Sequence, residues 1–278
     1  MLTNSREINL LTPSNQLPLY PKRILVTAPR NYAYRLCEEI IKQGGIPVIM
    51  PTIETCLLSD YTELDNSLNN LEQFNWIIFT SRNGIMAFFQ RLHNLNIPLS
   101  RLQNSRLCAL GKDSEILLSL GGRVDLVPQE PSPAGIVAEL SKIPNIYNQT
   151  VLVPAPEVVG LPEPNVIPNL INDLNKLGMQ VTRLPTYMTQ NVDKNIYQVE
   201  LNLIRQGMID MIAFTSTAEV ESFLRMFDSK SDYENSIIAC FGPYTAANTE
   251  SLGVEVSIVS KDYSSFAGFT AAMADFFT

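Results

Sequence analysis

A strand-length apolar run that ends in Thr-Ser and continues as a helix-period pattern occurs twice in this chain. The first copy, at residues 76–84, reads WIIFTSRNG, and the second, at residues 211–219, reads MIAFTSTAE. An unbroken apolar run is typical of a parallel strand that is buried on both faces, and a Thr or Ser after it suits the N-cap of a helix. The duplication therefore predicts two α/β units of similar build.

The repetition extends beyond these two copies. Phe79 and Phe214 are 135 positions apart, and Gly111 and Gly242, each at the end of another predicted strand, are 131 positions apart. Each half contains about five predicted strands that alternate with helices, including a strand at residues 124–128. This order predicts a doubly wound arrangement in both halves. A proline-rich stretch at residues 154–168 is expected to be a loop.

Two extended segments, residues 46–55 and 180–189, occupy equivalent places in the two halves. Both are flanked by prolines, which do not suit the middle of a sheet. We expect residues 51–55 and 182–190 to pair as a two-stranded connector. One lobe then combines residues 1–50 with 191–278, and the other consists of residues 56–181.

The composition excludes several classes of partner. With 20 basic and 28 acidic residues, the formal charge is −8, which argues against binding to nucleic acid or to an anionic membrane surface. No run of apolar residues is long enough to span a bilayer. Residues 1–20 read as a poorly ordered leader rather than a signal peptide. We therefore expect a cytoplasmic protein.

The sequence lacks the usual cofactor and metal motifs. Cys37, Cys56, Cys108 and Cys240 are widely spaced, so they support neither a disulfide framework nor a zinc site. No Gly-x-Gly-x-x-Gly or Gly-Lys-Ser/Thr loop is present, and His93, the single histidine, lies in a polar stretch typical of a surface. These observations predict that the protein uses no cofactor or metal and is not a Ser-His-Asp hydrolase.

Three motifs, in this order and at these separations, resemble the uroporphyrinogen-III synthase family. They are FTSRNG at residues 79–84, PTY at 185–187, and FGPYTAA at 241–247 followed by Leu252-Gly253, and the resemblance runs from Arg23 onward. It implies two flavodoxin-like lobes, with parallel sheets flanked by helices, joined by a β-ladder. The sequence departs from the family where Thr27-Ala28-Pro29-Arg30 replaces Thr-Arg-Pro and where the proline-rich stretch follows Val153.

The resemblance also implies an activity. Members of this family are lyases that close the linear tetrapyrrole hydroxymethylbilane with loss of water and inversion of the last ring, a step in heme and chlorophyll biosynthesis. A monomeric enzyme with this small-molecule substrate and no cofactor is expected. Tyr187, in the predicted connector, is by resemblance the general acid that assists the departing hydroxyl.

The net negative charge conflicts with a polycarboxylate substrate, and the turns after the strands resolve this conflict. Backbone N–H groups at helix N-termini and nearby hydroxyls bind carboxylates without cationic side chains. The predicted substrate-binding residues in one lobe are Thr80, Ser81, Asn83, Gly84 and Ser114. In the other lobe they are Thr215, Ser216, Gly242 and Thr245.

Each of these residues also has a purely structural interpretation. The Thr and Ser side chains can serve only as helix caps, the glycines can serve only the backbone, and Tyr187 can pack at a strand edge. The duplicated architecture alone is equally compatible with a non-enzymatic, two-lobed binding protein for a small polyanion. The activity and the binding function therefore both remain open from the sequence.

Overall fold

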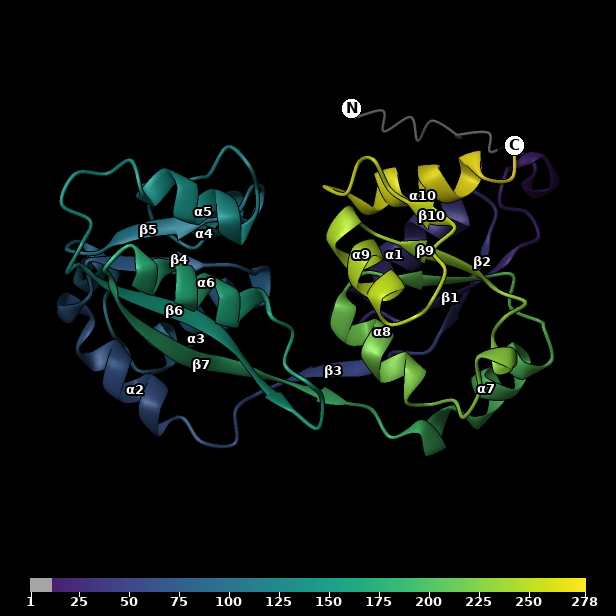
Figure 1. Ribbon diagram of the computed structural model, residues 1–278, viewed down its shortest axis with the longest axis horizontal. Coiled ribbons are helices and arrows are strands. Elements are labelled where there is room, and N and C mark those ends of the chain that lie inside the picture. Colours follow the sequence, from purple (N-terminus) through teal and green to yellow (C-terminus); the bar gives the residue numbers. More distant parts are fainter. Residues whose placement is uncertain (1–11) are drawn as a thin grey trace, which may run out of the picture. The chain divides into compact units, whose positions relative to one another are not determined.

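The computed structural model describes residues 12–278 (Figure 1). The chain separates into two compact units: unit 1 contains residues 12–53 and 192–278, and unit 2 contains residues 54–191. Each unit is built around one five-stranded sheet. The chain therefore passes between the units twice, after Ile53 and after Asn191.

In unit 1 the strand order is β10-β9-β8-β1-β2, and all four neighbouring pairs are parallel. The strands are β1 (Arg23–Val26), β2 (Ile46–Ile49), β8 (Met211–Phe214), β9 (Ile237–Cys240) and β10 (Ile258–Val259). The α-helices are α1 (Arg30–Lys42), α7 (Gln198–Arg205), α8 (Thr217–Leu224), α9 (Pro243–Ser251) and α10 (Phe266–Asp275).

In unit 2 the strand order is β3-β7-β6-β4-β5, and the pairs β7–β6, β6–β4 and β4–β5 are parallel. The strands are β3 (Ile53–Cys56), β4 (Trp76–Phe79), β5 (Arg106–Ala109), β6 (Thr150–Val159) and β7 (Gln180–Asn191). The α-helices are α2 (Thr62–Asn69), α3 (Arg82–Asn94), α4 (Asp113–Ser119), α5 (Pro133–Leu140) and α6 (Val166–Lys176). The predicted connector segments thus lie side by side, as β3 and β7.

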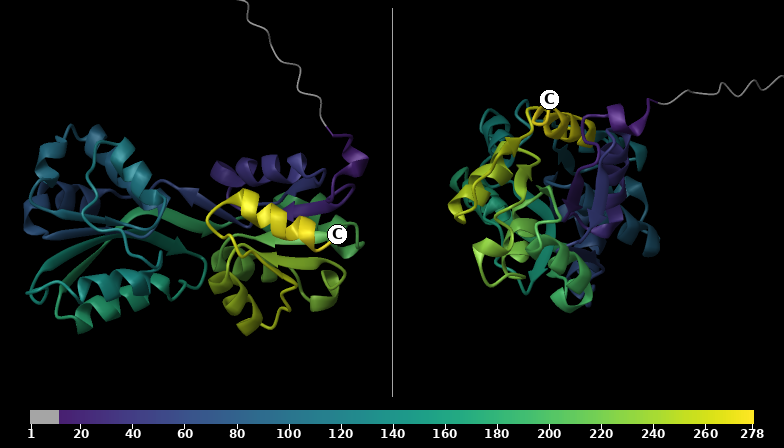
Figure 2. Two further views of the ribbon diagram at one scale, coloured as in Figure 1. Left: turned by 90° about the horizontal axis from the view of Figure 1, so that it is seen from above. Right: turned by 90° about the vertical axis from the view of Figure 1, so that its right-hand side faces the viewer.

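Helices cover both faces of each sheet (Figure 1; Figure 2). In unit 1, α7, α8 and α9 pack on one face, and α1 and α10 pack on the other. In unit 2, α2, α3 and α4 cover one face, while α5 and α6 cover the other. The predicted α/β class, with two parallel sheets flanked by helices, is confirmed.

Burial on both faces explains the unbroken apolar runs. Along β4, Trp76 and Ile78 pack into one core, whereas Ile77 and Phe79 pack into the other. The repeat also preserves packing detail: the Phe79 and Phe88 rings are 5.3 Å apart in unit 2, and the Phe214 and Phe223 rings are 5.3 Å apart in unit 1. Both pairs are edge-on, the geometry that aromatic quadrupoles favour.

The proline-flanked stretches are more regular than the sequence suggests. The loop predicted at residues 154–168 is partly wrong, because β6 continues through Pro154 and Pro156 to Val159, with a register shift between Ala155 and Pro156. Strand β4 pairs with β6 only at Val151 and Leu152. Pro154 and Pro156 lie beyond this pairing, so their missing N–H groups leave no acceptor on β4 without a donor. Residues 46–49 form β2, an edge strand where a proline is tolerated.

Two further sequence predictions are corrected. The strand expected at residues 124–128 is reduced to one bridge between Cys108 and Leu126. Of the leader expected at residues 1–20, residues 1–11 lie outside the described part, while Ser14–Gln16 form a 3-10 helix and Leu19 is fully buried. The later part of this segment therefore belongs to the core of unit 1. Among the helices between residues 12 and 278, none has the length and apolar character needed to cross a bilayer.

Candidate functional site

Strand order identifies where each unit is suited to bind a ligand. In unit 1, β1 connects outward to β2, whereas its neighbour β8 connects in the other direction to β9. In unit 2, β6 and β4 have the same relation to β7 and β5. Open α/β sheets bind ligands at the carboxyl ends of strands where the connections diverge in this way. We call residues 27, 215–219 and 242–245 the unit 1 rim, and residues 80–84 and 111–114 the unit 2 rim.

The unit 2 rim is built around the side chain of Ser81. Ser81 is the N-cap of α3, and its hydroxyl oxygen accepts a hydrogen bond of 3.1 Å from the backbone N–H of Gly84. The same oxygen lies 3.3 Å from the Tyr187 hydroxyl, with either group able to donate. The structure therefore brings together three of the residues predicted from the sequence.

Tyr187 is almost completely buried, with 8% of its surface exposed. Burial raises the pKa of its phenol, and the hydrogen bond with Ser81 opposes this shift. The phenol is therefore protonated at neutral pH. When Ser81 donates to the Tyr187 oxygen, the phenol proton is left free to donate elsewhere.

Gly84 is a position of close approach. A Cβ atom there would lie 3.3 Å from Oγ of Ser81 and 3.4 Å from the carbonyl oxygen of Pro154. These distances are tight, because β6 and the first turn of α3 lie close together at this edge. Glycine thus keeps the backbone of the turn close to both neighbours.

The remaining predicted residues of the unit 2 rim differ in their bonding. Between residues 12 and 278, no hydrogen bond engages the side chains of Thr80 and Asn83, both half-buried. The Ser114 hydroxyl donates to the carbonyl oxygen of Gly111 at 2.6 Å, and its backbone N–H bonds the same oxygen. Ser114 therefore has only acceptor capacity left, and Gly111, with φ of +46°, provides the left-handed turn.

The unit 1 rim is organised by the carboxyl group of Glu219, which the sequence analysis missed. Its Oε2 lies 2.9 Å from the backbone nitrogen of Thr215 and 2.8 Å from Oγ1 of Thr27. Its Oε1 accepts hydrogen bonds from the hydroxyls of Thr215, Ser216 and Tyr32. The side chain is fully buried, and this burial raises the pKa of Glu219 against the opposing effect of the hydrogen bonds.

A sequence signal for this arrangement exists. Ser216 is the N-cap of α8 and accepts a hydrogen bond of 3.4 Å from the Glu219 backbone N–H. Ser-x-x-Glu is the capping-box pattern, in which the Glu side chain turns back toward the start of its helix. In the first copy of the repeat, Gly84 occupies the position of Glu219, so the two rims differ at this point.

The third predicted segment, after β9, places Gly242 as the N-cap of α9 and Thr245 in its first turn. A Cβ atom on Gly242 would lie 3.2 Å from Cβ of Tyr263, so a close approach favours glycine here. Its φ of −157° is extended backbone that any residue adopts. Thr245 is buried, with 7% of its surface exposed.

Free backbone donors are a shared property of the rims. Within the described part of the chain, no hydrogen bond engages the backbone N–H groups of two first-turn residues in each of three helices. They are Arg82 and Asn83 in α3, Thr217 and Ala218 in α8, and Tyr244 and Thr245 in α9. Such groups, with the positive end of the helix dipole, bind carboxylates.

Cationic side chains near the rims are already engaged. Arg82 forms an ion pair of 3.6 Å with Asp113, and Arg30, displaced from its usual family position, donates to the hydroxyl of Tyr197 at 3.1 Å. Both of these guanidinium groups thus already have a partner.

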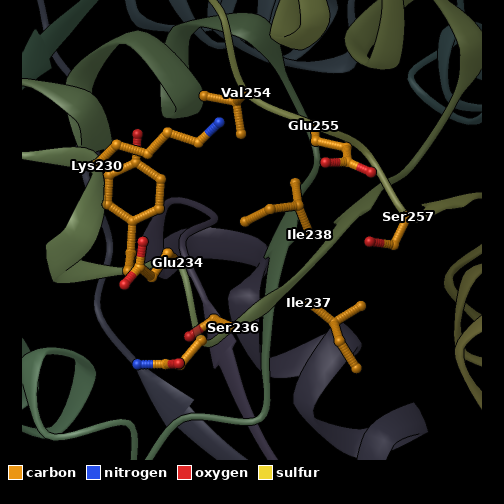
Figure 3. A pocket seen from close by; sticks show the side chains of 10 residues that line it. Lys230, Glu234, Ser236, Ile237, Ile238, Val254, Glu255 and Ser257 are labelled. Carbon is orange, nitrogen blue, oxygen red and sulfur yellow. The ribbon is translucent and has the colours of Figure 1, made fainter.

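A cavity of about 360 Å³ in unit 1 lies elsewhere (Figure 3). It is lined by residues at the amino end of β9 and by residues in the segment before β10, among them Lys230, Glu234, Ile237 and Glu255. No rim residue lines it, so it does not belong to the candidate site. Between residues 12 and 278, no cluster of three or more His, Cys, Asp or Glu side chains is arranged to hold a metal ion.

Comparisons with known proteins find relatives along most of the chain. A family model described as "Uroporphyrinogen-III synthase HemD" matches residues 35–269. The uroporphyrinogen-III synthase of Synechococcus elongatus is 25% identical over 252 residues, which cover 88% of this chain and 92% of the relative. The porphyrin biosynthesis protein HemD of Ruminiclostridium josui is 24% identical over 249 residues, or 88% of this chain, but the match spans only 47% of that relative.

The fold is also shared with a solved structure. A mutant uroporphyrinogen III synthase from the extremely thermophilic bacterium Thermus thermophilus superposes with a TM-score of 0.65 at 18% identity, covering 91% of this chain and 99% of the other. At this identity the likeness shows a common fold.

Proposed function

Because the chain belongs to the uroporphyrinogen-III synthase family, we propose that it closes hydroxymethylbilane to uroporphyrinogen III, with loss of water and inversion of the last pyrrole ring. The family match, which extends over residues 35–269, is the observation that carries this proposal. The reaction makes the protein a lyase of tetrapyrrole synthesis, acting without a cofactor. A cytoplasmic location and a monomeric state belong to the same proposal.

The substrate carboxylates bind to the first turns of α3, α8 and α9. A hydrogen bond to a charged group contributes about 1.5–3 kcal/mol, and the helix dipole adds about 0.3–1 kcal/mol. Several carboxylates held in this way fix a bent substrate, even on a protein with a net charge of −8. Positioning of this kind is the largest task of the protein, since the pyrroles are themselves reactive.

Tyr187 assists the departure of the hydroxyl group. Its buried phenol is a weak acid, so it donates a hydrogen bond to the leaving oxygen rather than surrendering its proton early. Ser81, 3.3 Å from the phenol oxygen, orients that donor.

Separation of the two product isomers tests the proposal. Hydroxymethylbilane is generated in the assay, the purified chain is added, and the type III and type I isomers are quantified. We expect type III product in proportion to the amount of chain. Type I product alone, at the rate seen without the chain, would overturn the activity and leave the polyanion-binding function as the better account.

A further inference from the structure

Glu219 lies where the connections diverge in unit 1, yet nothing in the proposed reaction uses it. It joins three segments: Thr27 after β1, Thr215 after β8, and α8, on which it lies. Its backbone carbonyl accepts a hydrogen bond of 3.0 Å from Thr52 in the segment after β2. A fully buried ionisable side chain in such a place needs a chemical explanation.

Hydrogen-bond counting indicates which form of the carboxyl group is present. The Thr27 hydroxyl lies 2.9 Å from the carbonyl oxygen of Ala213 and 2.8 Å from Oε2 of Glu219. Thr27 has only one hydroxyl proton, so it cannot donate to both oxygens. Both contacts are satisfied when Glu219 is protonated on Oε2 and donates to Thr27, which in turn donates to Ala213.

The electrostatic surroundings favour the same form. No Lys, Arg or His within residues 12–278 stabilises a charge on Glu219, and desolvation is the largest influence on its pKa, raising it. The titratable groups that face it are Tyr32 from α1 and Cys240 from β9, and Glu250 on α9 also acts on Cys240. All of these are neutral or negative at neutral pH, so none compensates a carboxylate.

A second observation at this rim points toward a ligand. The hydroxyl of Thr217, in the first turn of α8, is more than nine-tenths buried and has no hydrogen-bond partner in the described structure. Buried hydroxyls are rarely left unpaired in native proteins. The backbone N–H groups of Thr217 and Ala218 are likewise unbonded among the described residues.

We propose that Glu219 is a positioning residue for substrate binding at the unit 1 rim. As a neutral acid it holds the side chains of Thr215 and Ser216, and loss of its proton weakens binding of the substrate. The inference rests on the proposed function. Neutral Glu219 keeps the two hydroxyls in place without opposing a nearby substrate carboxylate. The ionised form places a negative charge behind the same turn, where low dielectric makes the repulsion strong.

The test compares kcat and KM of the wild type with those of Glu219→Gln at a series of pH values across the range in which both proteins stay folded, with formation of type III product as the readout. In the wild type, KM rises about tenfold or more as Glu219 ionises, while kcat changes less. In Glu219→Gln, which stays neutral, this rise is absent. Glu234→Gln, an exposed carboxyl in the same unit, serves as the matched control and follows the wild type.

A second measurement is independent of activity. Infrared difference spectra between the wild type and Glu219→Gln show the C=O stretch of a protonated carboxyl group in the wild type at neutral pH. Absence of this band, or a KM that varies with pH equally in the two proteins, overturns the inference. A wild type that forms no type III product at any pH overturns the proposed function instead, and the infrared band still reports on Glu219.

Discussion

Replacement of Glu219 by glutamine gives a stability change whose dependence on pH follows from the structure. The carboxyl group is fully buried, and burial raises its pKa in the folded state above the ordinary value of 4.5. Between the unfolded and folded pKa values, the unfolded chain releases a proton that the folded chain keeps. The free energy of unfolding therefore falls as pH rises through this window, by about 1.4 kcal/mol per pH unit.

Glutamine removes this dependence and adds a constant cost. Its NH₂ group, placed at Oε2, faces the backbone N–H of Thr215, which is 2.9 Å away, so two donors oppose each other. An unsatisfied buried donor costs about 1–3 kcal/mol. We expect Glu219→Gln to be less stable than the wild type near pH 4.5 and to gain on it by about 1.4 kcal/mol for each pH unit above that value, up to the folded pKa.

Urea denaturation followed by circular dichroism at a series of pH values measures this difference. Glu234→Gln, an exposed substitution in unit 1, should differ from the wild type by a constant amount. Trp76, the single tryptophan, lies in unit 2, so its fluorescence reports separately on that unit. A stability deficit of Glu219→Gln that stays constant with pH, or that grows as pH rises, would refute the assignment of a raised pKa.

Three further predictions concern the site and the cores. Tyr187→Phe should lower kcat about ten- to a hundredfold, with Ser81→Ala giving a smaller decrease, in the isomer assay; an unchanged kcat for the tyrosine variant would remove its acid role. Phe223→Ala should lower the free energy of unfolding by about 3–5 kcal/mol in urea titrations, and a loss below about 1 kcal/mol would contradict its core position. Burial raises the pKa of Cys108 to about 12 and that of Cys240 to about 11, so a thiol reagent at about pH 8 should modify neither until the protein unfolds; rapid labelling of either would contradict this burial.

The order of strands and helices was largely predictable from the sequence because burial on both faces leaves a strong pattern. The run from Trp76 to Phe79 supplies apolar side chains to two cores at once, and its second copy in β8 does the same. The prolines misled the prediction at Pro154 and Pro156. Whether a proline ends a strand depends on which neighbour needs its N–H, and neighbours are set by the tertiary fold.

The candidate site was predictable in part. Ser81 and Tyr187 lie far apart in sequence. The turn after a predicted strand indicated Ser81, the resemblance indicated Tyr187, and the structure adds the contact between them. Glu219 was missed although its capping-box spacing with Ser216 is visible. An acidic residue in a first helical turn is normally exposed, and only the fold shows that Thr27, from the other end of the chain, closes over it.

Hydrogen exchange of the first-turn amides, measured with and without uroporphyrinogen III, tests most directly whether both rims bind the tetrapyrrole carboxylates. The N–H groups at residues 82–83, 217–218 and 244–245 should exchange rapidly in the free protein and slowly in the complex. Slowing confined to one unit, or confined to residues 230–238 and 254–257 around the cavity in unit 1, would contradict substrate binding by the two rims.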